Sequence, residues 1–172
     1  DFHIRMEEDV LISAGSGLEQ VTWMDVRIGD VLPTPRHGKP VEINAYWYND
    51  LRIMEQFSKL LNEEVNDYGK LAEKVRQSFL RQFWNDKEEC LKDVISGTKA
   101  DNQVRCNQIW AVSVPFGMLS EEQALKVVDK VFEKLYTPYG LRSLSPSDEE
   151  YHPFYGGKLW SRDTAYHQGT VW

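Results

Sequence analysis

Residues 21–50 combine one carboxylic acid beside a tryptophan with many further aromatic and hydrogen-bonding side chains. Large rigid rings occur at Trp23, Tyr46, Trp47 and Tyr48, and directional hydrogen-bonding groups occur at Asp25, Arg36, Glu42, Asn44 and Asn49. A pocket for a polyhydroxylated ligand needs both kinds of contact, because rings cover the faces of a sugar and polar groups bind its hydroxyls. The segment therefore predicts a carbohydrate site.

Asp25 is the candidate catalytic residue of this segment. Hydrolysis of a glycosidic bond ordinarily takes two carboxyl groups, one that donates a proton to the leaving oxygen and one that activates water or attacks carbon. A carboxyl beside an apolar ring such as Trp23 is a reasonable proton donor, because desolvation favours its neutral form. From the residues alone, a loop aspartate that caps a turn is the alternative.

Arg36 and Glu42 are the next charged candidates. Arg36 either holds a ligand hydroxyl or braces Asp25. Glu42 is the tempting second carboxyl, but it stands near the expected start of a helix, where an acid suits the helix dipole. We prefer the dipole role for Glu42.

Two later groups of polar residues also suit a pocket. Asn107 and Gln108 place two amides beside Trp110, and paired donors and acceptors suit sugar hydroxyls, although such amides also satisfy backbone groups at a helix start. Tyr166, His167 and Gln168 follow the Arg162–Asp163 pair in the segment SRDTAYHQGTVW. A single histidine is more often a structural residue than a catalyst, and adjacent opposite charges are more often an ion pair.

Five motifs occur in order along the chain: TWMD at residues 22–25, TPRHGKPVEINAYWYN at 34–49, VRCNQIWAVSVP at 104–115, TPYGLRSLSP at 137–146 and YHPFYGGKLWSRDTAYHQGTVW at 151–172. In these motifs the chain resembles the amylo-α-1,6-glucosidase portion of glycogen debranching enzymes. The resemblance runs from about Asp9 to the last residue. One departure is Cys106, which stands where the family often has proline.

The resemblance implies an inverting glycoside hydrolase that removes single α-1,6-linked glucose stubs from glycogen or a related α-glucan. Asp25 in TWMD would be the general acid, and the second acid would be a glutamate beyond residue 172. The resemblance also turns eight further residues into candidate substrate-binding residues: Trp23, Arg36, Asn107, Gln108, Arg162, Tyr166, His167 and Gln168. The family needs no cofactor, and no metal-ligand spacing or glycine-rich phosphate loop occurs in the sequence.

The fold that the resemblance implies is all-α, a toroid of six inner and six outer helices as in six-hairpin glycosidases. About half of such a ring fits into 172 residues, so we expect one partial domain over residues 1–172. A partial ring predicts apolar helix faces without a cover, hence self-association, and an isolated chain without hydrolytic activity.

Two other functions agree with the same residues. One is a related toroid hydrolase, glucoamylase-like or trehalase-like, that acts on another linkage. The other is a carbohydrate-binding helical module without catalysis, which a pocket lacking a glutamate in the complete protein would favour.

Composition excludes several classes of function. The chain has 41% hydrophobic and 27% charged residues, which is ordinary for a globular protein, and a formal net charge of −7. No basic cluster suits a nucleic acid, and no apolar run predicts a membrane span or a secretory signal. Cys90 and Cys106 are too few for a disulfide framework. We therefore expect a cytoplasmic protein with two idle thiols and a neutral glucan as its partner.

The elements that position these residues are mostly helices. Glycines and prolines within residues 21–39 predict a loop that carries Trp23 and Asp25. A helix over residues 41–61 follows, with Pro40 near its first turn and one apolar stripe of Trp47, Leu51, Met54, Phe57 and Leu61. A second helix begins after Asn66 or Asp67 as its cap and ends near Trp84, with Tyr68, Leu71, Val75, Phe79 and Phe83 inward.

The rest of the chain predicts shorter elements. Residues 96–102 form a polar connection, and residues 107–114 form a short helix that ends before Pro115. Ser120 and Gln123 have the spacing of a capping box, which opens a helix with Leu125, Val128, Phe132 and Leu135 inward. Residues 139–157 are expected to be irregular, and a last helix begins at Arg162 and continues to the end of the chain.

Overall fold

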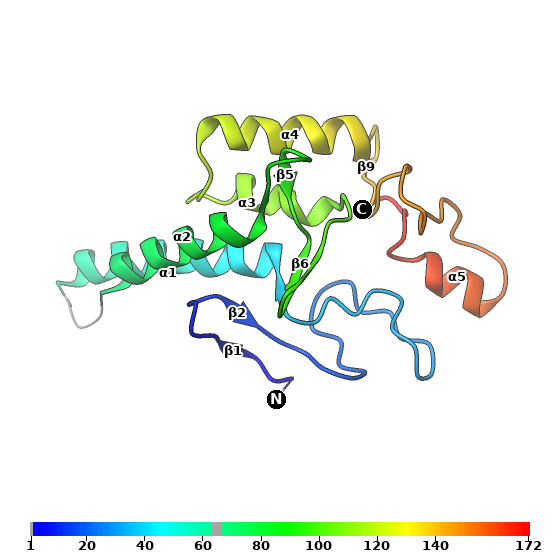
Figure 1. The fold of residues 1–172 in the computed structure, drawn as a ribbon, viewed down its shortest axis with the longest axis horizontal. Helices are drawn as coiled ribbons and strands as arrows, with labels where there is room; N and C mark the ends of the chain where they lie inside the picture. Colours follow the sequence, from blue (N-terminus) through cyan, green and yellow to red (C-terminus); the bar gives the residue numbers. More distant parts are fainter. Residues whose placement is uncertain (1, 63–66) are drawn as a thin grey trace.

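The computed structural model describes residues 2–62 and 67–172 (Figure 1). Helix α1, Val41–Leu61, and helix α2, Tyr68–Phe83, form the predicted hairpin. Pro40 is the N-cap of α1, and the Asp67 carboxylate caps α2 by accepting a hydrogen bond from the Lys70 amide. Asn66, the alternative cap, lies outside the described residues. Val75, Phe79 and Phe83 are fully buried, which confirms the inward stripe of α2.

A short helical segment fills the space between the hairpin and a fourth long element. It consists of the 3-10 helix η1, Cys106–Ile109, and helix α3, Trp110–Ser113. Helix α4, Glu121–Leu135, lies above it, and η1 contacts both α1 and α4 (Figure 1). The Ser120–Gln123 capping box is present, as predicted. The apolar core lies among these helices and includes Val41, Phe79, Val127 and Leu135.

The inward face of α4 differs from the prediction. Val127, Val131 and Leu135 are buried, whereas Leu125 and Phe132 are 58% and 64% exposed and Val128 is also exposed. Two neighbouring stripes of α4 are apolar with the same three- and four-residue spacing, so periodicity alone did not choose between them. Only Leu135 of the predicted set points into the core.

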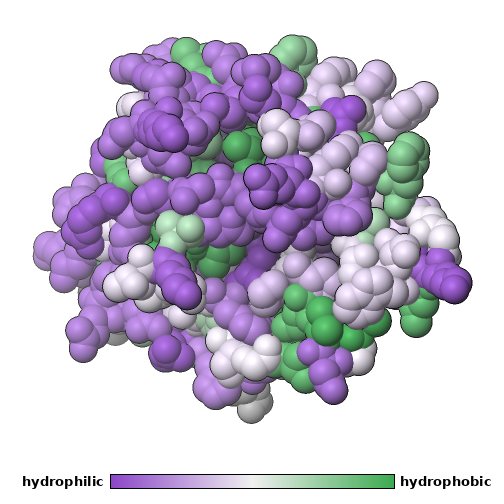
Figure 2. All heavy atoms as spheres, turned by 45° about the vertical axis from the view of Figure 1, so that its right-hand side comes forward, coloured by the Kyte–Doolittle hydropathy of each residue, from purple (hydrophilic) through white to green (hydrophobic). Residues whose placement is uncertain are grey.

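The apolar stripe of α1 is buried only in its first half. Leu51 is 2% exposed, but Met54, Phe57 and Leu61 are exposed. The end of α1 that carries these three residues extends, with the start of α2, beyond the other helices (Figure 1). Hydrophobic side chains are also exposed among hydrophilic ones on the face that Figure 2 shows. Self-association through the exposed stripes of α1 and α4 stays a prediction.

Within residues 2–62 and 67–172 the structure has nine short strands, and the sequence interpretation named none of them as a strand. They are β1 Arg5–Met6, β2 Ile12–Ser13, β3 Lys39–Pro40, β4 Trp84–Asn85, β5 Cys90–Leu91, β6 Val94–Ser96, β7 Lys99–Asp101, β8 Tyr136–Thr137 and β9 Gly140–Leu141. Each has only two or three residues, too few for an alternating pattern to be recognised in the sequence. The all-α prediction is therefore confirmed only in part, and the toroid stays a prediction.

One of these sheets joins the loop of residues 21–39 to the middle of the chain. Its strand order is β3-β6-β7, all antiparallel, and Pro40 pairs with Val94. The turn of this sheet between β6 and β7 lies in the segment expected to be a polar connection. Gly38 has a φ of +106°, and a Cβ atom there would collide with the Ile95 carbonyl oxygen. Only glycine therefore allows this close approach.

The end of the chain also differs from the prediction. Helix α5, Leu159–Ala165, begins before Arg162 and ends soon after it. Gly169 has a φ of +138°, which a continuing helix does not allow, and the last residues pair instead with β9. The Leu141 amide donates to the Trp172 carbonyl oxygen at 2.7 Å, and the Trp172 amide donates back at 2.8 Å. This pairing brings the last tryptophan next to the helical core.

Candidate functional site

The turn before β3 carries Arg36 into the interior. Arg36 has a positive φ of 43°, a conformation that costs energy for a residue with a side chain. Its side chain is nevertheless almost fully buried, at 5% residue exposure. Such a residue persists only where its surroundings hold it in place. Those surroundings are two acids on neighbouring elements.

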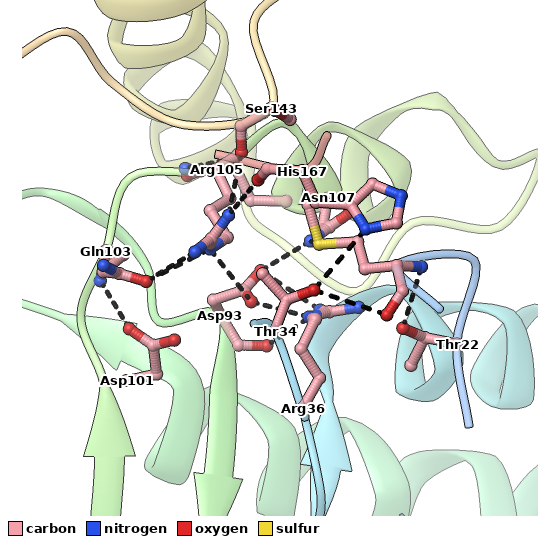
Figure 3. Close-up of polar contacts among 12 residues, drawn as sticks. Thr22, Thr34, Arg36, Asp93, Asp101, Gln103, Arg105, Asn107, Ser143 and His167 are labelled. Carbon is pink, nitrogen blue, oxygen red and sulfur yellow. Dashed lines mark hydrogen bonds and ion pairs between the residues drawn. The ribbon is translucent and has the colours of Figure 1, made fainter. Parts of the chain in front are cut away.

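Glu42 and Asp93 both pair with the Arg36 guanidinium, and Figure 3 shows the pair with Asp93. The Arg36 Nε donates to Asp93 Oδ2 at 2.7 Å, and Arg36 Nη2 donates to Glu42 Oε2 at 2.7 Å, while Nη1 donates to Glu42 Oε1. Burial alone would lower the pKa of Arg36, but the two carboxylate charges outweigh burial and raise that pKa. The guanidinium is therefore a permanent buried cation.

The backbone brings the two acids to the same place. The Val41 amide at the start of α1 donates to the Asp93 carbonyl oxygen at 2.9 Å, so Glu42 in the first turn of α1 stands over the same guanidinium. Arg105 lies on the other side, with its Nε 3.9 Å from Asp93 Oδ2. All four charged side chains are buried, and two cations balance two anions.

Trp23 is attached to this buried cluster through Asn107. The Asn107 Nδ2 donates to Asp93 Oδ1 at 2.8 Å, and the Trp23 indole Nε1 donates to Asn107 Oδ1 at 2.7 Å. Met24, the next residue of the loop, is buried against the same amide. The loop of residues 21–39 is therefore held at both ends by one polar network.

Trp23 borders a cleft of about 430 Å³, which we call the aromatic cleft. Its walls are Trp23, Glu42, Ile43, Tyr46, Cys106, Asn107, Ile109, Trp110, Leu141 and Trp172. Trp23 and Trp172 meet edge to face with ring centroids 5.2 Å apart, and Tyr46 and Trp110 meet at 5.4 Å on another part of the wall. Two pairs of rings and one tethered amide are the combination that sugar binding requires.

Asp25, the predicted general acid, lies two residues from Trp23 and is exposed to solvent. Among the described residues, no hydrogen bond or ion pair to its carboxyl group occurs, and its carbonyl oxygen accepts a hydrogen bond from Gln20 Nε2. Its charge acts on the buried ring of His167. The carboxyl is therefore open to solvent, although Asp25 is not among the residues that line the aromatic cleft.

His167 is buried behind Trp23, with 1% exposure. Its ring lies 5.3 Å from Trp23 edge to face and 4.7 Å from Tyr166. Burial lowers the pKa of His167 to about 4, although the charge of Asp25 acts in the opposite direction. The imidazole is therefore neutral at pH 7.

The two nitrogens of His167 are in different situations. Nδ1 lies 3.5 Å from Thr34 Oγ1, whose hydroxyl donates to the Met24 carbonyl oxygen, also at 3.5 Å. Because the hydroxyl has one proton, Thr34 accepts from Nδ1–H, and Nε2 is left as an acceptor. Among the described residues, Nε2 is the one buried side-chain nitrogen or oxygen atom without a partner.

The remaining predicted site residues lie in different places. Gln108 is buried, accepts from the Leu91 amide at 3.2 Å and donates to the Arg105 carbonyl oxygen at 3.2 Å. The Gln168 amide oxygen accepts from Arg105 Nη2 at 2.7 Å, and its nitrogen donates to Glu150 at 3.2 Å. Both amides thus bind the protein itself.

Arg162 and Tyr166 lie in and just after α5. Arg162 pairs with Asp163 at 2.8 Å, the adjacent ion pair that the sequence offered as an alternative, and its guanidinium lies 5.8 Å from the Tyr155 ring. Tyr166 packs edge to face on Trp172 at 5.0 Å and so supports the aromatic cleft from behind. The structure brings Trp23, Asn107 and Trp172 to one wall and leaves Arg162 outside it.

A second cleft of about 490 Å³ lies on the other side of Arg36, and we call it the polar cleft. Its walls are Pro33, Thr34, Pro35, Arg36, His37, Val94, Ser96, Lys99, Asp101, Gln103, Arg105 and Glu150. The Gln103 amide donates to Asp148 at 3.1 Å and to Glu150 at 3.0 Å, and its oxygen accepts from Arg105. Every hydrogen-bonding group of the Gln103 amide is thus bonded to other residues of the protein.

Asp93 and Arg105 are central residues that the sequence interpretation missed. Asp93 stands with Lys92 between two apolar pairs, Cys90–Leu91 and Val94–Ile95, and a charge among residues that are expected to be buried needs a partner. That signal was present in the sequence. Asn44 and Asn49, in contrast, were named for ligand contact but bind the backbone at Ile12, Pro40 and Phe116.

The remaining expectations concern the two cysteines, metal ligands and membrane-spanning helices. Cys90 and Cys106 are both buried as free thiols, and burial raises the pKa of Cys106 to about 12. Within residues 2–62 and 67–172, no three histidine, cysteine or acidic side chains are grouped as metal ligands. In the same ranges no helix is both long enough and apolar enough to cross a bilayer.

The fold is similar to that of a known hydrolase. Neutral trehalase Nth1 from Saccharomyces cerevisiae superimposes with a TM-score of 0.55 and 18% sequence identity over 63% of this chain and 22% of that chain. At this identity the likeness defines the fold class alone. The helices of this chain therefore have the arrangement found in part of that trehalase.

The family follows from the sequence match. The family model described as amylo-alpha-1,6-glucosidase matches residues 1–172, so the chain belongs to the amylo-alpha-1,6-glucosidase family. The glycogen debranching enzyme of Saccharomyces cerevisiae (strain ATCC 204508 / S288c) is 27% identical over 205 residues. That alignment covers 94% of this chain and 13% of the yeast protein, so the chain spans a small part of its relative's length.

Proposed function

We propose that the protein carrying this chain is a glycoside hydrolase that removes single α-1,6-linked glucose residues from glycogen or a related α-glucan. The membership of the chain in the amylo-alpha-1,6-glucosidase family supports this substrate class. The observation that carries the proposal is the exposed carboxyl of Asp25, two residues from a tryptophan that lines an aromatic cleft. A sugar stacked on Trp23 would bring its glycosidic oxygen near this acid.

In the proposed reaction Asp25 is the general acid. It donates a proton to the leaving glycosidic oxygen while a second carboxylate activates water on the opposite face of the sugar. Inversion requires the two carboxyl groups to be about 6.5–9.5 Å apart, which leaves room for that water. His167 is buried behind Trp23 and does not line the aromatic cleft, so it would act on the sugar only by supporting the Trp23 ring.

Glu42 is a poor candidate for the second carboxylate although it lines the aromatic cleft. Both of its oxygens accept hydrogen bonds from Arg36, so activating water would require breaking a buried bidentate ion pair. We therefore assign the base to a residue outside residues 1–172, and we expect the isolated chain to bind glucose units without hydrolysing them.

The substitution Asp25→Asn in the full-length gene product tests this assignment. It removes the proton donor and keeps the shape of the side chain, so release of glucose from a limit dextrin with single α-1,6-linked stubs should fall ~10²–10⁴-fold. The thermal unfolding midpoint should not change. Asp30→Asn is the matched control, because Asp30 is another exposed acid of the same loop and should keep activity.

Two outcomes contradict the proposal. Turnover by Asp25→Asn within a few-fold of the unchanged enzyme would show that Asp25 is not the acid. Release of glucose from trehalose but not from α-1,6 stubs would show that the fold is used on another linkage. A substrate panel containing both sugars therefore separates the residue assignment from the linkage assignment.

A further inference from the structure

Asp93 has no role in the proposed reaction, and it lies in the middle of the polar network behind the aromatic cleft (Figure 3). It is 2% exposed and comes directly before β6. Its backbone is fixed from two sides, because its amide donates to the Asp101 carbonyl oxygen at 2.9 Å and its own carbonyl oxygen accepts from the Val41 amide. The carboxylate therefore has a defined position.

The Asp93 carboxylate determines which way the Asn107 amide points. A carboxylate only accepts hydrogen bonds, so the amide must turn its nitrogen toward Asp93, at 2.8 Å from Oδ1. The amide oxygen then faces the opposite way, where the Trp23 indole N–H donates to it at 2.7 Å. An indole N–H only donates, so both neighbours of Asn107 demand the same orientation.

We propose that Asp93 is a positioning residue that holds Trp23 in the wall of the aromatic cleft through Asn107. The inference rests on the proposed function only for its catalytic consequence, since the chain of hydrogen bonds exists without substrate. Trp23 is the ring nearest to Asp25 in sequence, and its edge meets both Trp172 and His167. A displaced Trp23 would therefore change the wall against which a sugar stacks.

An exchange of the two side chains tests the direction of the hydrogen bonds. In Asp93→Asn the oxygen of the new amide is held by the Arg36 Nε donor, so its NH2 faces Asn107; Asn107 then accepts with its own oxygen and turns its nitrogen toward the Trp23 N–H. In the double variant Asp93→Asn/Asn107→Asp the carboxylate moves to the middle position. It can accept from the new amide and from the Trp23 N–H at the same time, so the bond to Trp23 is restored.

The readout is the indole N–H resonance of Trp23 in the full-length gene product, with nitrogen-15 in its tryptophans. Trp23→Phe assigns the resonance. We expect Asp93→Asn to shift this resonance and to speed its exchange with water, and the double variant to return it to the original position. Asp101→Asn is the matched control. Asp101 is a neighbouring acid in β7, and its carboxylate accepts from the backbone N–H of Gln103 rather than from Asn107.

The catalytic consequence is measured on the same variants. Misplacing a binding group by about 1 Å can cost ~10²-fold, so kcat/KM for α-1,6 stubs should fall by up to that factor in Asp93→Asn and recover in the double variant. If the resonance follows the prediction while kcat/KM does not, Asp93 positions Trp23 but the proposed sugar site is wrong.

Three results overturn the inference itself. The first is an unchanged Trp23 resonance in a folded Asp93→Asn protein. The second is a double variant that folds with a displaced resonance, because Asp93 then acts only as a structural charge. The third is a double variant that does not fold although Asp93→Asn alone folds, because both variants have lost the same carboxylate beside Arg36 and differ only at the position between it and Trp23. If Asp93→Asn alone does not fold, the position of the Trp23 resonance in the double variant tests the inference.

Discussion

The aromatic cleft and the polar cleft have similar volumes, about 430 Å³ and 490 Å³, and the buried Arg36 network lies between them. In the polar cleft the walls are mostly polar, and Gln103 has a partner for every group of its amide. In the aromatic cleft four rings stand at the wall, and the exposed acid Asp25 lies two residues from one of them. Volume therefore does not mark a sugar site, whereas ring faces combined with polar groups do.

The first way to sharpen this comparison is to remove Arg36, which lines the polar cleft and pairs with Glu42 in the wall of the aromatic cleft. Arg36→Leu leaves Glu42 and Asp93 buried without their partner, which typically costs about 3–5 kcal/mol. Lys99→Leu changes a cation on the exposed wall of the polar cleft and should alter stability by less than about 0.5 kcal/mol. Urea unfolding of both variants measures the difference. Equal decreases in the free energy of unfolding of the two variants would show that the buried Arg36 network contributes no more to stability than an exposed cation.

The next prediction concerns the pH dependence of stability, which should come from His167, the buried ring behind Trp23 of the aromatic cleft. The pKa of His167 is about 4 in the folded protein and about 6.5 in an unfolded chain, so the unfolded state binds the proton first as pH falls. Stability is thus complete above pH 6.5 and is lost between about pH 6.5 and pH 4, by up to about 3 kcal/mol. His167→Phe should remove this slope.

His152→Phe, which changes an exposed histidine, is the control for that measurement. It should leave the slope between pH 6.5 and pH 4 in place, because the buried His167 ring is unchanged in that variant. A slope that survives in His167→Phe would assign the acid sensitivity to another group.

The smallest expected effect is on ligand affinity. Trp23→Ala should weaken binding of isomaltose to the full-length gene product by about tenfold, which corresponds to about 1.4 kcal/mol. Ser96→Ala on the wall of the polar cleft should leave affinity unchanged. Isothermal titration measures both. A loss of affinity in Ser96→Ala alone would move the sugar site to the polar cleft.

Several elements could be predicted from the sequence because their signals are local. The bounds of α1 follow from Pro40 and a helical apolar pattern, and the start of α4 follows from the Ser120–Gln123 capping box. The loop position of Asp25 follows from the glycines and prolines around it. The α4 face could not be predicted, since both of its apolar stripes satisfy the same periodicity and only the neighbouring η1 selects one.

The sequence by itself determined the helical hairpin and the family and proposed candidate site residues, because propensity, capping and motif order are properties of neighbouring residues. Only the tertiary structure decided which polar side chains are committed to the protein. Gln108, Gln168 and Asn44 satisfy the protein's own polar groups, while Asp93, which motif reading passed over, orients Asn107 toward Trp23. The physical reason is that a buried donor or acceptor must find a partner, and that partner comes from residues distant in the sequence.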